Sequence, residues 1–100
     1  MSDRGRDQGE FITVRATVHG RVQGVGFRFS ARSKATRLGV AGWVRNDPSG
    51  TVSVLCEGPR NRVERFLDWL RQGPPSARVT KVDSQEEPYR GEFSGFGVKG

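Results

Sequence analysis

The chain has 100 residues and a formal net charge of +6, with 17 Lys and Arg against 11 Asp and Glu. A chain of this length supports one hydrophobic core, and the regular patterning of its apolar residues argues against a disordered protein. Its single cysteine excludes a disulfide framework and a cysteine-based metal cluster.

The first ten residues, MSDRGRDQGE, contain nothing apolar beyond Met1 and predict a flexible tail outside the fold. They also lack the apolar segment of a signal peptide, and no apolar run elsewhere is long enough to span a membrane. We therefore expect a cytoplasmic protein with one domain at residues 11–100 and no membrane partner. The small size of this domain favours a monomer.

The first half of the domain predicts a strand, a helix and a hairpin. Residues 11–19 alternate apolar and polar side chains, which is typical of a half-buried strand. Residues 27–38 carry apolar side chains at helical spacing, and Gly39 is a suitable helix end. Two further strands, at residues 40–46 and 51–57, flank the turn sequence NDPSG and predict a hairpin.

The second half predicts a helix and two strands. Pro59 and Gly73 delimit a helix whose apolar stripe consists of Val63, Phe66, Leu67 and Leu70. Residues 77–83 predict a strand, with Val79 and Val82 directed inward. Residues 84–92, SQEEPYRGE, predict a loop, and residues 93–99 predict a short edge strand weakened by its glycines.

The resulting order, β-α-β-β-α-β with a possible fifth strand, matches the split βαβ or ferredoxin-like arrangement. This is an α+β fold in which two helices cover one face of an antiparallel sheet. Charge is distributed unevenly along it, because residues 11–46 contain no Asp or Glu and seven cations: Arg15, Arg21, Arg28, Arg32, Lys34, Arg37 and Arg45. Such a one-sided field attracts anions.

The segment GRVQGVGFR, residues 20–28, joins the first predicted strand to the first helix and has three glycines within seven residues. It lacks the Gly-Lys-Ser/Thr of a Walker A loop, and Phe29 stands where a dinucleotide fingerprint needs its third glycine. A plain tight turn is one interpretation. However, glycines allow backbone N–H groups to converge at a helix N-terminus, where the helix dipole is positive, so the loop is also a candidate anion site.

Arg28 strengthens the anion interpretation. A cation in the first turn of a helix is disfavoured by about 0.3–1 kcal/mol, and the loop contains no acid to offset it. An anion between the guanidinium and the N–H groups would remove this repulsion. The fork of donors on an arginine suits a phosphoryl group.

The rest of the chain limits what chemistry such a site performs. His19, at a strand end, is interpreted as a surface residue, Cys56 as a buried apolar one, and we find no acidic cluster for Mg²⁺. A reaction here should therefore need no cofactor, metal or acid catalyst. Hydrolysis of a carboxylic–phosphoric anhydride qualifies, because the leaving carboxylate has a conjugate acid of pKa about 4 and departs unprotonated.

The sequence resembles the acylphosphatase family. One motif is VHGRVQGVGFR at residues 18–28, and the other is GWVRN at residues 42–46. Further matching pieces are GTV at 50–52, Gly58, Phe66, Gly73-Pro74 and ARV at 77–79. The resemblance, from about Phe11 to Lys99, implies a small ferredoxin-like hydrolase that acts on acyl phosphates without a metal.

The resemblance also implies the roles of individual residues. Arg28 would bind the substrate phosphate together with the backbone of the preceding loop, which consists of Arg21, Val22, Gln23, Gly24, Val25 and Gly26. The side chain of Asn46 would hold the attacking water. By its own sequence context, NDPSG, Asn46 is a turn residue, so its catalytic role comes from the resemblance alone.

Two alternatives remain at this point. The arrangement and the basic charge also fit an RNA-recognition motif, but the predicted strand TVSVLCE lacks the aromatics that such a module needs, so we do not expect a nucleic-acid partner. The other alternative is a regulatory domain that binds phosphate without turnover. A small-molecule acyl phosphate is the expected ligand.

Overall fold

The computed structural model describes residues 10–100. Of the predicted tail, residues 1–9 lie outside this described range. Glu10, the last residue of the predicted tail, contacts the start of a helix: its carbonyl accepts a hydrogen bond from the Arg60 N–H at 2.8 Å, and its carboxylate lies 2.7 Å from Nε of Arg60.

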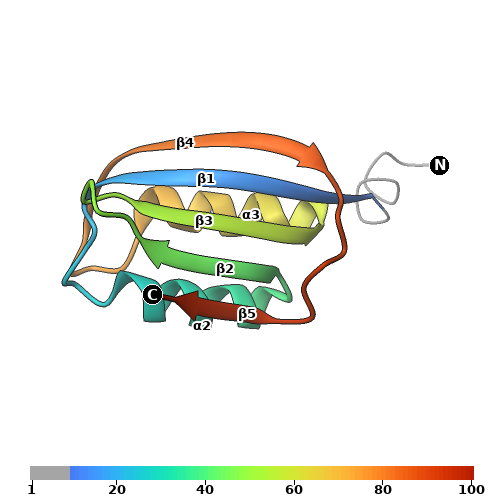
Figure 1. The fold of residues 1–100 in the computed structure, drawn as a ribbon, viewed down its shortest axis with the longest axis horizontal. Helices are drawn as coiled ribbons and strands as arrows, with labels where there is room; N and C mark the ends of the chain where they lie inside the picture. Colours follow the sequence, from blue (N-terminus) through green and yellow to red (C-terminus); the bar gives the residue numbers. More distant parts are fainter. Residues whose placement is uncertain (1–9) are drawn as a thin grey trace.

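Strands and helices follow each other in the predicted order (Figure 1). They are β1 (Phe11–Arg21), α2 (Phe27–Leu38), β2 (Ala41–Asn46), β3 (Val52–Pro59), α3 (Arg60–Gln72), β4 (Arg78–Pro88) and β5 (Phe96–Lys99). The sheet order is β4-β1-β3-β2-β5, and both helices cover the same face of the sheet. The predicted ferredoxin-like α+β fold is confirmed. One pair departs from the antiparallel prediction, because β5 lies parallel to β2.

The core lies between the sheet and the helices. Alternate residues of β1 and β3 point toward the helices, and the predicted stripe of α3 packs against them, with Val63, Phe66 and Leu70 fully buried. From α2, Phe27, Ala31 and Ala35 are buried as their spacing predicts, whereas Leu38 is half-buried. Burying a side chain such as Phe66 stabilises the fold by about 1.5–3 kcal/mol. No helix within residues 10–100 has the length and apolar character needed to cross a membrane.

One secondary-structure prediction was wrong. The segment 84–88, predicted as the start of a loop, continues β4 as far as Pro88, where it pairs with Ile12 of β1. β4 is an edge strand in which no side chain is fully buried, so polar side chains are tolerated along it. Two kinds of contact stabilise this segment instead of apolar burial. They are backbone pairing with β1 and cross-strand ion pairs, such as Arg15 Nε to the Glu87 carboxylate at 3.1 Å.

Candidate active site

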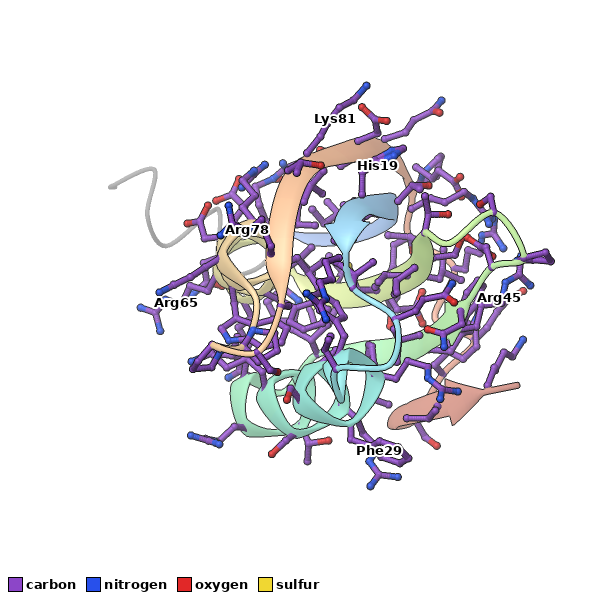
Figure 2. All side chains as sticks on the ribbon, turned by 90° about the vertical axis from the view of Figure 1, so that its left-hand side faces the viewer. His19, Phe29, Arg45, Arg65, Arg78 and Lys81 are labelled. Carbon is purple, nitrogen blue, oxygen red and sulfur yellow. The ribbon has the colours of Figure 1, made fainter. Side chains whose placement is uncertain are left out.

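The ends of several elements meet at one end of the molecule. β1 and β2 are both antiparallel to β3, so they run in the same direction and their last residues, Arg21 and Asn46, lie at the same end of the sheet. α2 begins at this end, directly after the loop formed by residues 22–26. Figure 2 views the molecule from this end, where the loop after β1 runs into α2.

The loop of residues 22–26 leaves its N–H groups available. Gly24 and Gly26 have φ angles of 73° and 75°, a left-handed conformation that residues with a Cβ rarely adopt. Two loop carbonyls have donors: Ser76 Oγ donates to Val25 at 2.7 Å, and the Ser30 N–H donates to Gly26 at 3.1 Å. Among residues 10–100, no acceptor receives a hydrogen bond from the backbone N–H groups of the loop. The loop therefore presents donors that a bound anion can use.

Arg28 is the second residue of α2, and the first turn of this helix contains no acid. Within the described range, no Asp or Glu carboxylate lies within 4.0 Å of its guanidinium. Its Nη1 donates a long hydrogen bond of 3.5 Å to the backbone oxygen of Gly100, and the group lies 5.9 Å from the centre of the Phe29 ring. No acidic side chain between residues 10 and 100 therefore neutralises this charge.

The side chain of Gln23 connects the loop to the β2–β3 turn. Its Nε2 donates to the backbone carbonyl of Asp47 at 2.7 Å and to that of Thr51 at 2.9 Å. These bonds join the loop to the turn that begins directly after Asn46. The sequence analysis expects Gln23 to act only through its backbone. A glutamine in a glycine-rich loop does not indicate which distant carbonyls its side chain contacts.

Asn46 ends β2 and pairs with Val52 of β3. Its Oδ1 is buried, and no donor among residues 10–100 reaches it. A buried carbonyl oxygen without a donor is uncommon, because leaving it unsatisfied costs about 1–3 kcal/mol. This oxygen is therefore an unused acceptor at the strand end that Gln23 links to the loop.

The Asp47 carboxylate stabilises the turn next to Asn46. It accepts hydrogen bonds from Ser53 Oγ and from Thr51 Oγ1, and Arg45 Nε lies 3.3 Å from it. These contacts, the Ser53 bond first, hold the pKa of Asp47 below its ordinary value despite partial burial. The carboxylate is thus ionised at neutral pH and fixed to its own turn.

The groups interpreted from sequence as structural lie outside this arrangement. His19 Nε2 lies 3.0 Å from Asp83. Figure 2 shows His19 on the β1–β4 side of the sheet. Cys56 is buried, as predicted, and burial, with a smaller contribution from Glu57, raises the pKa of its thiol to about 12. Residues 10–100 contain no cluster of three His, Cys, Asp or Glu side chains placed to bind a metal.

Comparison of the sequence with known proteins points to one family. The acylphosphatase family model matches residues 14–98. An acylphosphatase from Thermococcus kodakarensis is 53% identical over 89 residues, which cover 89% of this chain and 97% of the relative. The structure of an acylphosphatase from Coxiella burnetii superimposes with a TM-score of 0.86 at 37% identity, covering 91% of this chain and 95% of the other. The crystal structure of acylphosphatase from Bacillus subtilis gives 0.85 at 35% identity, with 88% and 98% covered.

The match extends over nearly the whole of the described fold, at high identity and with similar chain lengths. The resemblance carried by the two sequence motifs is therefore confirmed. The chain belongs to the acylphosphatase family and is an acylphosphate phosphohydrolase, an enzyme that hydrolyses the anhydride between a carboxylate and a phosphate.

Proposed function

We propose that the phosphate of a small acyl phosphate binds between the guanidinium of Arg28 and the backbone N–H groups of residues 21–26. The available N–H groups of the loop and the absence of an Asp or Glu partner for Arg28 within residues 10–100 support this binding mode. The positive end of the α2 dipole lies at the same place. Together these groups stabilise the negative charge on the phosphoryl oxygens as the reaction proceeds.

In this mechanism the side chain of Asn46 orients the attacking water. The amide of this side chain forms a hydrogen bond with the water, whose oxygen then attacks phosphorus in line with the departing carboxylate. The single observation that carries the proposal is the position of Asn46 at the end of β2, next to the turn to which Gln23 tethers the loop. Holding the water in position supplies catalysis through orientation.

The remaining steps need no side-chain acid or base. A phosphoryl oxygen of the substrate takes the proton of the attacking water, while the P–O bond to the acyl group breaks and its electron pair leaves with the carboxylate. The carboxylate needs no proton because its conjugate acid has a pKa of about 4. We accordingly propose that turnover requires no metal ion, and that dialysis against a chelator leaves the rate unchanged.

The test of the Asn46 role uses a matched pair of variants. Asn46→Ala should lower kcat for benzoyl phosphate about 100- to 1,000-fold, because the water loses the side chain that orients it. Asn61→Ala is the control, since Asn61 also has a buried Oδ1 without a donor in the described range but lies at the start of α3, at the far end of the molecule. Near-normal kcat in Asn46→Ala contradicts the proposed role.

A second pair tests Arg28. Arg28→Ala should lower kcat/KM at least about 100-fold and abolish competitive inhibition by inorganic phosphate. Arg32→Ala removes a guanidinium from the next turn of α2, where it also lies near the Phe29 ring, at 5.4 Å from its centre. This control should retain activity and phosphate inhibition. If both variants lose activity equally, general charge rather than a specific phosphate contact explains the result.

A further inference from the structure

Ion pairs with carboxylates are common on the open face of the sheet and at the two ends of α3, where Arg60 and Arg71 are paired, but they are missing from the groove between the helices within the described range. On the open face of the sheet, carboxylates lie within 4.0 Å of Arg15, Arg45, Lys81 and Arg90. Lys99, on the same face, lies 4.7 Å from the centre of the Trp43 ring. The groove between the two helices has a different arrangement.

Four cations line the groove between α2 and α3. They are Lys34 and Arg37 from α2, and Arg62 and Arg65 from α3. Within residues 10–100 none of the four has a carboxylate within 4.0 Å. Figure 2 shows Arg65 and the paired Arg45 on opposite sides of the molecule. The groove between α2 and α3 is therefore a positive strip whose four cations have no carboxylate partner in the described range.

The groove has room for a ligand. It consists of two hollows of about 580 and about 480 Å³, and Arg37 borders both. Neither hollow has an Asp or Glu in its lining. The uncharged polar lining residues are hydroxyls and amides, which all can donate hydrogen bonds to anionic oxygens: Ser30, Ser33, Thr36, Asn61 and Gln72.

An aromatic surface lies at one end of the groove. Trp69 is half-buried and lines the larger hollow. Its indole is stacked on the Phe66 ring at an interplanar angle of 5° and a centroid distance of 6.2 Å, so it is supported from within the core. A rigid, partly exposed indole beside a row of cations is the combination on which a nucleic-acid base stacks while its backbone follows the charges.

We propose that the α2–α3 groove binds single-stranded nucleic acid, with phosphates along Lys34, Arg37 and Arg65 and a base against Trp69. The groove follows α2, whose 12 residues span about 18 Å, enough for a short stretch of backbone. An acidic peptide would satisfy the cations but would make no use of the indole as a stacking surface. An RNA-recognition motif carries its aromatics on strands, so the lack of aromatics in β3 does not bear on a groove between helices.

This groove is distinct from the proposed phosphate site. Arg28 contacts Gly100, which follows β5, whereas Lys34 and Arg37 line the flank of α2 that faces α3. The two anion sites therefore lie on different flanks of the same helix. Binding in the groove and hydrolysis of acyl phosphates can be measured independently.

The experiment measures fluorescence anisotropy of a labelled oligothymidylate of about 12 nucleotides at about 50 to 200 mM salt. If three or four cations contact phosphates, the slope of log K against log salt should be about −2 to −3, because each contact contributes about −0.7 for a single strand. A variant carrying Lys34→Gln, Arg37→Gln and Arg65→Gln should bind at least about 10-fold more weakly, with a slope near zero to −1. Arg62 is kept because its guanidinium packs over Gly39 at the end of α2.

The matched control carries Arg15→Gln, Lys81→Gln and Arg90→Gln, which lower the net charge equally but lie on the open face of the sheet. It should bind the oligonucleotide as wild type does, and both triple variants should hydrolyse benzoyl phosphate at the wild-type rate, which shows that they are folded. Equal loss of binding in the two variants overturns the proposal. Absence of binding by wild type at low salt, or displacement of the probe by polyglutamate as readily as by unlabelled oligothymidylate, also overturns it.

Discussion

The connection between the loop and the β2–β3 turn gives a quantitative prediction for Gln23→Ala. This substitution removes two hydrogen bonds, to the carbonyls of Asp47 and Thr51. Each bond in a partly buried position contributes about 0.5–1.5 kcal/mol, so the free energy of unfolding should fall by about 2 kcal/mol. A domain of this size loses about 4–8 °C in Tm per kcal/mol, which predicts a decrease of about 8–16 °C.

The same substitution should affect catalysis in a specific way. In the proposed mechanism Arg28 and the loop N–H groups are still able to bind phosphate in the variant, but the loop is no longer held at a fixed distance from Asn46. Since misplacement of reacting groups by about 1 Å lowers rates about 100-fold, we expect kcat to fall about 10- to 100-fold and KM to change less. The assays are thermal unfolding by circular dichroism and initial rates with benzoyl phosphate.

Ser49→Ala is the control for this prediction. It removes a hydrogen bond of 2.9 Å between the hydroxyls of Ser49 and Thr51 in the same turn, but this bond is exposed and does not reach the loop. It should change the free energy of unfolding by less than about 0.5 kcal/mol and leave kcat unchanged. If Gln23→Ala lowers Tm as calculated yet keeps the wild-type kcat, the hydrogen bonds stabilise the fold without positioning the site, and the reasoning is refuted.

Three further predictions concern buried or ionised groups. Cys56, with its pKa raised to about 12 by burial, should not react with iodoacetamide at pH 8 in the native protein, but should react in urea; mass spectrometry of the adduct is the check. Asp47 has a lowered pKa in the folded state, so its contribution to stability is present above the unfolded pKa of about 3.9 and is lost as pH falls below it. In urea titrations Asp47→Asn should be less stable than wild type at pH 7, and its free energy of unfolding should decrease less in acid. Glu57 is 1% exposed and accepts hydrogen bonds from Thr13 Oγ1 and from the N–H groups of Gly91 and Phe93. Glu57→Gln places an amide NH₂ against these donors, so it should lower the free energy of unfolding by about 2–4 kcal/mol and increase hydrogen exchange in residues 89–95.

The parts of the fold that the sequence predicted well are those in which local pattern and burial agree. Apolar spacing and Gly39 defined α2, and the stripe on α3 is buried as its periodicity indicates. The segment 84–88 was missed because an edge strand needs no alternating apolar residues when its partner supplies the backbone pairing. A local pattern does not record such a partner.

Some residues of the candidate site can likewise be recognised from local sequence, and others cannot. The glycines and Arg28 conflict with local preferences, and that conflict by itself indicates an anion site. The role proposed for Asn46 rests on a family resemblance, because its own context predicts only a turn. Gln23 and the buried Glu57 could not be recognised from sequence, since both act on backbone groups distant along the chain: Asp47 and Thr51 for the amide, Gly91 and Phe93 for the carboxylate.

The strand order of the sheet has a consequence for how the chain folds. Of the neighbouring strands in the sheet, only β2 and β3 are joined by a short turn. The other paired strands are remote in sequence: Phe11 pairs with Pro59, Ile12 with Pro88 and Gly42 with Phe96. Each of these pairings closes a long loop and loses chain entropy before its contacts form. We therefore expect refolding after rapid dilution from denaturant in milliseconds to seconds rather than microseconds, with the β2–β3 hairpin as the one pairing that forms without a long closure.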